Sequence, residues 1–274
     1  MASFNVDPRA PRNFKHSDML GAAPLQTLVR NLISGKVDPT EGAPYVSAVV
    51  PTTRLGITRV TLKSPADLHA YDSARRHTGP VARDPNYGVP AKDQQIPNSS
   101  YGIVDSHAVL TLTSGDRYQV ELKGFAYGTI SLDLETFDDD QPTAVRKFID
   151  VPFSPKTVAT MTLQGTNMTE LGVDLQGDGR VDFYLPASGA ANTAISIRML
   201  AMIVQSLGLE KGLETGLLAK LSAAAVSVDQ GKSKTAQNQL AAFINAVNAQ
   251  GGKAIAADAA KGLAAIAMKI TRSV

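Results

Sequence analysis

The sequence predicts a multidomain β plus α protein, in which an antiparallel β-sandwich follows a short helix-containing extension and precedes a small helical bundle. All 15 prolines lie at or before Pro186, whereas residues 191–274 hold 20 alanines among 84 positions. A Pro-free, Ala-rich tail favours helices, and the Thr-rich body before it favours strands. Apolar residues recur at every second position in the body and about every 3.6 positions in the tail. We therefore expect three parts, at residues 1–54, 55–189 and 190–274.

The first part contains one clear element, an amphipathic helix within residues 25–33. Its apolar residues lie at helical spacing, and the glycine that follows is typical of a helix end. These residues are Leu25, Leu28, Val29, Leu32, Ile33 and Gly35.

The middle part alternates apolar and polar residues, which is typical of antiparallel strands with one buried face. Short runs with turn signals between them predict a β-sandwich over roughly residues 55–185. Residues 72–107 are the exception, because five prolines and glycines fall within 79–90, and we predict a long polar loop there. The alternating runs are 57–62, 108–112, 118–122, 129–137, 145–149 and 158–163.

The last part predicts three or four short helices joined by tight turns, as in a small antiparallel bundle. Its apolar stripes are expected to be core rather than a ligand groove. Asp229-Gln-Gly231 and Gln250-Gly-Gly252 are expected to end two of the helices. The predicted helices cover about residues 193–207, 213–228, 240–247 and 255–270.

Composition excludes several classes of function. The 274-residue chain has no cysteine, which excludes disulfides, thiolate metal sites and cysteine nucleophiles. A net charge of +2 gives no argument for nucleic acid or an anionic membrane surface as partner. We expect no membrane span, since no run of about 18 apolar residues occurs. The opening Met1-Ala-Ser-Phe lacks the features of a signal peptide, so we expect either a cytoplasmic protein or a piece of a longer one.

One segment follows the spacing of a calcium loop, with side-chain oxygens at alternate positions and Gly179 at the sharp turn. Leu185 stands where such a loop would need its bidentate glutamate. We favour a β-hairpin with its tip at Gly177-Asp-Gly179, and weak calcium binding is the alternative. The candidate ligands are Asp174, Gln176, Asp178 and Asp182.

Two histidines, His69 and His77, lie close in the sequence to Asp67, Asp72 and Asp84. A His/Asp metal site is one interpretation, because both residue types bind metals. Their spacing matches no closed metal motif, so we favour scattered surface residues.

The segment from Phe14 to Gly35, with His16 followed by Leu20, resembles the last strand–loop–helix of secreted α/β-hydrolases of the lipase and esterase kind. The resemblance implies that His16 is a catalytic base. That family places a serine, in a Gly-x-Ser-x-Gly elbow, and then an acid before this histidine. The elbow occurs nowhere in this sequence, so His16 would be an orphaned triad member.

Residues 210–270 resemble a FIMAH domain, a small helical module at the C-terminus of many bacterial exported and cell-surface proteins. Residues 64–72 and 76–79 resemble the immunoglobulin-like β domains that follow hydrolase or adhesion domains. These resemblances imply an immunoglobulin-like sandwich and a secreted or cell-envelope location. The FIMAH-like core pattern consists of Leu240, Phe243, Ile244 and Val247.

We therefore expect a non-catalytic accessory region of an exported bacterial protein, with a binding or presentation role. The surfaces to test are the loop 72–107 and the outer sheet face. One alternative is the C-terminal part of a secreted serine hydrolase, whose serine and acid would lie in an upstream domain. Another is a structural spacer or adhesion module. No cofactor other than calcium is expected, and the ligand or cell-envelope partner is unidentified.

Overall fold

The computed structural model describes residues 5–6, 23–35, 46–47, 56–63, 65–83, 90–138, 141–187 and 192–274. The chain divides into two compact units, Met1–Arg54 and Leu55–Val274.

The described residues of the N-terminal unit form the helix α1 (Ala23–Ile33) and the strands β1 (Asn5–Val6) and β2 (Val46–Ser47), which pair antiparallel. The predicted amphipathic helix is confirmed. Leu28 is buried in it, and Gly35, with φ of 68°, adopts the left-handed conformation common after a helix. His16 lies outside the described residues, so its predicted catalytic role stays a prediction.

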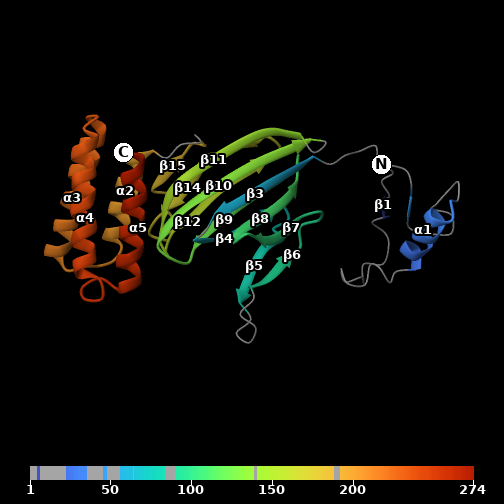
Figure 1. Ribbon diagram of the computed structural model, residues 1–274, viewed down its shortest axis with the longest axis horizontal. Coiled ribbons are helices and arrows are strands. Elements are labelled where there is room, and N and C mark those ends of the chain that lie inside the picture. Colours follow the sequence, from blue (N-terminus) through green and yellow to red (C-terminus); the bar gives the residue numbers. More distant parts are fainter. Residues whose placement is uncertain are drawn as a thin grey trace. The chain divides into compact units, whose positions relative to one another are not determined.

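The second unit contains two antiparallel sheets, which confirms the expected mixed β plus α fold (Figure 1). All six runs predicted from alternation lie in strands. The five-stranded sheet has the order β11 (Gln141–Phe153), β10 (Gly128–Asp138), β3 (Ile57–Lys63), β8 (His107–Thr113) and β7 (Ser100–Val104). The eight-stranded sheet has the order β15 (Phe183–Leu185), β14 (Leu171–Asp174), β12 (Val158–Gln164), β9 (Arg117–Gly124), β4 (Ala66–Asp72), β5 (His77–Arg83) and β6 (Pro90–Gln94), and β13 (Asn167–Met168) pairs with β12.

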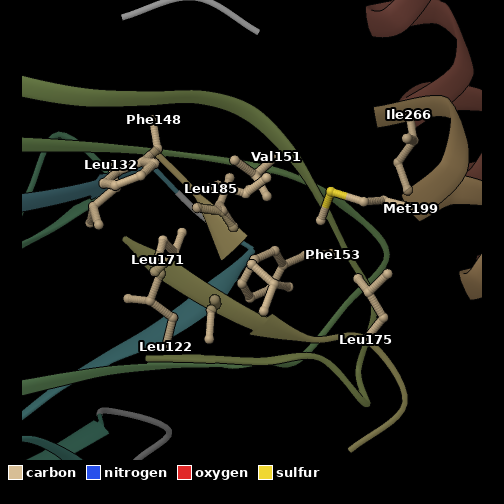
Figure 2. Close-up of a cluster of buried hydrophobic side chains, with 14 of the residues drawn as sticks. Leu122, Leu132, Phe148, Val151, Phe153, Leu171, Leu175, Leu185, Met199 and Ile266 are labelled. Carbon is tan, nitrogen blue, oxygen red and sulfur yellow. The ribbon is translucent and has the colours of Figure 1, made fainter. Parts of the chain in front are cut away.

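The two sheets bury their inward faces in one hydrophobic core. On β9, for example, Val120 and Leu122 are fully buried, Glu121 between them is half-buried, and Gln119 and Lys123 on either side are exposed. This alternation is what one-sided burial requires of a strand. Figure 2 shows part of the core, in which Val151 of β11 and Met199 of the helical segment line the same small cavity. The sheets and the helices therefore share one continuous core.

The predicted long loop at residues 72–107 is wrong, because three strands, β5, β6 and β7, lie within it. The prolines and glycines of this segment favoured a loop in the sequence-based prediction. A strand nevertheless tolerates proline at positions where its backbone nitrogen would not donate a hydrogen bond to a neighbouring strand. Pro80 lies past the β4–β5 ladder, whose paired residues are Ala70 with Thr78 and Tyr71 with His77. On its other side Pro80 pairs with Lys92 of β6, where the register of that ladder becomes irregular. β6 lies at the edge of its sheet and begins with Pro90. Proline is tolerated at such a position because an edge strand has a side without ladder hydrogen bonds.

Four helices follow, as the sequence predicts: α2 (Thr193–Gln205), α3 (Lys211–Asp229), α4 (Ser233–Gln250) and α5 (Ala257–Ser273). Consecutive helices pack on one another, and α2 and α5 also pack against β11 (Figure 1). Lys269 of α5 lies 2.8 Å from the Asp150 carboxylate of β11, joining the two layers. Among the helices that the structure describes, none combines the length and apolar character needed to cross a membrane.

Candidate functional site

The predicted calcium loop connects β14 to β15, which form the predicted β-hairpin. Asp174 organises the loop with its carboxylate. Its Oδ1 accepts N–H bonds from Gln176 (3.1 Å), Gly177 (2.7 Å) and Asp178 (3.4 Å), and its Oδ2 accepts one from Gly179 (2.8 Å). The two glycines have φ of 71° and 84°, which lets the backbone curl around this carboxylate.

The other two carboxylates of the loop also accept backbone N–H groups. Asp178 Oδ1 accepts from Arg180 at 2.9 Å, and Asp182 Oδ2 accepts from Leu175 at 2.8 Å. Within the part of the chain that the structure describes, no group of three or more His, Asp or Glu side chains is arranged to hold a metal ion. The loop is thus a hydrogen-bonded hairpin turn, and calcium binding there stays a prediction.

The eight-stranded sheet presents a second surface, which we call the outer face. It consists of the side chains that alternate with core residues and point away from the five-stranded sheet. The strand register aligns them in cross-strand rows. One row is Tyr184, Gly172, Thr160, Glu121 and His69, and a second is Thr162, Gln119, Tyr71 and His77.

At the β15 end of the outer face, two side chains lie over Gly172. A Cβ at Gly172 would lie 3.3 Å from Val181 Cγ2 and 3.5 Å from Tyr184 Cε1, so the missing side chain makes room for both. Tyr184 is nevertheless 64% exposed and Val181 39% exposed. An open groove begins here and continues over β12 and β9, lined by Thr160, Thr162 and Gln119 among others.

At the opposite end, two histidines hydrogen-bond to each other. His69 Nδ1 lies 3.0 Å from His77 Nε2, and His77 Nδ1 lies 3.4 Å from Asp93 Oδ2. Gln95 Nε2 donates to the same Asp93 oxygen at 2.7 Å, which helps to hold the carboxylate. With both rings neutral, a proton on His77 Nδ1 facing Asp93 makes His77 Nε2 the acceptor for His69 Nδ1–H. That arrangement leaves the second ring nitrogen of His69 as an acceptor.

Burial and nearby charges set the protonation state of this end. His69 is only 8% exposed, and burial, with the Lys123 and His77 charges adding to it, lowers its pKa from 6.5 to about 4. Lys123 Nζ lies 2.8 Å from Glu121 Oε1, and this hydrogen bond raises the pKa of Lys123. Burial raises the pKa of Tyr71. The imidazole of His69 is therefore neutral at neutral pH, and the neighbouring Lys123 is paired with Glu121.

Only part of this surface could be found from the sequence. The sequence points to the outer sheet face and to the two histidines, but it gives no sign that Asp93, 16 residues after His77, is the partner of His77. Strand register makes His77 and Asp93 neighbours, because Asp93 of β6 pairs with Gly79, which lies two residues after His77 on β5. Of the carboxylates in the sequence-based His/Asp interpretation, Asp72 binds Arg76, its Oδ2 lying 2.6 Å from Arg76 Nε, and Asp84 lies outside the described residues.

No family model, no curated protein and no solved structure matches the chain.

Proposed function

We propose that this chain is a non-catalytic binding region of an exported bacterial protein, with the outer face as its binding surface. The observation that carries the proposal is the row from Tyr184 to His69, in which polar and aromatic side chains follow one another across five strands. Binding surfaces need groups that can desolvate and hydrogen-bond to a partner, and aromatic residues with one polar atom do both.

The histidine end of the outer face supports binding rather than catalysis. His77 bonds to His69 and Asp93, which uses both of its ring nitrogens. A hydrolytic triad instead needs a histidine nitrogen bonded to a nucleophile. His69, with a pKa near 4, is also a weak base at neutral pH.

The finer identity of the two layers is part of the same proposal. An immunoglobulin-like sandwich and a FIMAH-like helical segment would place the chain in a secreted or cell-envelope protein. The resemblance of residues 210–270, with Leu240, Phe243 and Val247 fully buried in α4, supports this.

Binding of the purified chain to isolated bacterial cell envelopes tests the proposal. We expect saturable binding that is weakened by Tyr184→Ala and by Gln119→Ala. Phe125→Ala is the matched control, because Phe125 is an exposed aromatic residue in the turn between β9 and β10 and outside both rows. Absence of saturable binding, or equal loss in the control, would count against the proposal.

Two alternatives make different predictions in the same preparation. A serine hydrolase would turn over carboxylic esters and lose that activity on His16→Ala. A spacer would bind nothing, and no envelope component would raise its melting temperature.

A further inference from the structure

The outer face has the chemistry of a surface for hydroxyl groups. Thr160 and Thr162 offer hydroxyls that both donate and accept, and Gln119 offers an amide that does the same. Glu121 adds acceptor oxygens between Thr160 and His69 in the first row. A ligand that carries many hydroxyls can use such mixed donors and acceptors along its whole length.

The charges of the outer face argue against other macromolecules. A nucleic acid would need several unpaired cations, yet Lys123 is paired with Glu121 at 2.8 Å. A protein partner would need an apolar centre, yet threonines, Gln119, Gly172 and the exposed carboxylate Glu170 line most of the groove. Val181 is the one large aliphatic side chain of that lining with high exposure. An uncharged, polar ligand fits better than either.

The geometry of the first row sets the shape of that ligand. Five strands lie side by side from Tyr184 to His69, and neighbouring strands are about 4.8 Å apart, so the row is roughly 19 Å long. The step between strands is close to the advance of one pyranose ring along an extended chain. Tyr184, beside the small residue Gly172, offers a ring face at one end.

We propose that the outer face binds an uncharged polysaccharide, with the sugar chain lying across the strands from Tyr184 to His69. The inference rests on the proposed function and names its ligand class. A sugar ring stacks on Tyr184, and the hydroxyls of the following rings bond to Thr160, Gln119 and Glu121. His69, oriented by His77, accepts a hydrogen bond from a hydroxyl at the far end.

Affinity electrophoresis through gels that contain a soluble neutral polysaccharide tests this inference. The probes are hydroxyethylcellulose, mixed-linkage β-glucan and soluble starch, with polygalacturonate as the charged comparison. We expect at least one neutral probe to retard the wild-type chain and polygalacturonate to have no effect. We expect Tyr184→Ala to weaken that binding about tenfold, since ring stacking and a desolvated contact together account for an effect of that order.

Matched variants separate binding from folding. Tyr184→Phe keeps the ring face and should keep most of the affinity, and Phe125→Ala should keep all of it. Thermal melting of each variant identifies any that have lost the fold. His69→Gln should bind with reduced affinity but melt as a folded protein at neutral pH.

The outcomes distinguish this inference from the proposed function. Retardation by polygalacturonate alone, by none of the probes, or equally for wild type and Tyr184→Ala would overturn the polysaccharide assignment. If cell envelopes still bind the chain through Tyr184 in that case, the proposed function stands without it. If the envelopes show no saturable binding either, both fail.

Discussion

Lowering the pH should destabilise the protein through His69. Its imidazole is buried against β9 beside Lys123 and is bonded to His77 of β5, so the folded state favours the neutral ring. In the unfolded chain the same ring has an ordinary pKa near 6.5. Between pH 6.5 and 4 the unfolded state therefore binds a proton that the folded state does not.

The size of the effect follows from the two pKa values. At and above neutral pH the His69 ring is neutral in both the folded and the unfolded state, so its contribution to the unfolding free energy is fully present there. It falls as the pH drops through 6.5, and the loss is complete below about 4. The difference between 6.5 and about 4 corresponds to about 3 kcal/mol of unfolding free energy.

Urea unfolding at several pH values between about 7.5 and about 4, which span the expected transition of His69, measures this loss of unfolding free energy. We expect His69→Gln to remove about 3 kcal/mol of the pH dependence, because glutamine does not titrate. Gln119→Ala is the control, a change without a titrating group on the same sheet face, and should keep the wild-type dependence. Equal pH dependence in wild type and His69→Gln would refute the reasoning.

Three further predictions concern the helices and the hairpin loop. Gly262→Ala in α5 should lower the free energy of unfolding by about 1–3 kcal/mol, because the new Cβ would overlap Tyr127. Gly216→Ala in α3, with nothing near its Cβ, should raise the free energy of unfolding by about 0.5–1 kcal/mol. Urea unfolding of the two variants measures both changes. Asp174→Ala should lower stability more than Asp178→Ala, since it leaves four N–H groups without their acceptor rather than one. Millimolar Ca²⁺ should raise the melting temperature no more than Mg²⁺ does, and a calcium-specific rise lost in Asp178→Ala would establish a metal site instead.

The sequence predicted six strands from their alternating apolar and polar residues, which reflect burial of one face only. Leu132 and Leu134 of β10 alternate with polar residues because the core lies on one side only. The same logic failed for β6, Pro90–Gln94, because its sequence, Pro-Ala-Lys-Asp-Gln, has no apolar alternation to detect. Its strand conformation comes from pairing with β5, a long-range contact that no local pattern contains.

The candidate surface was less predictable than the fold for a related reason. Alternation tells which side chains point away from the core, but the neighbours of each one depend on strand register. His69 and His77 are eight residues apart, and the short β4–β5 ladder brings their rings together. The loop at Asp174 was recognisable, since its glycines and aspartates form a local pattern, although the pattern fits a hydrogen-bonded turn as well as a metal loop.

Tyr184 decides between a structural and a binding role for the outer face. A large ring beside a glycine is a known way to stabilise a strand, so Tyr184 over Gly172 could serve the sheet alone. A ring with only that role would gain most by covering the glycine and burying itself. Tyr184 remains 64% exposed, and it begins a row of polar side chains rather than an apolar cluster. Stability and affinity should therefore separate: Tyr184→Leu should keep the cover over Gly172, and with it the melting temperature, while losing the polysaccharide.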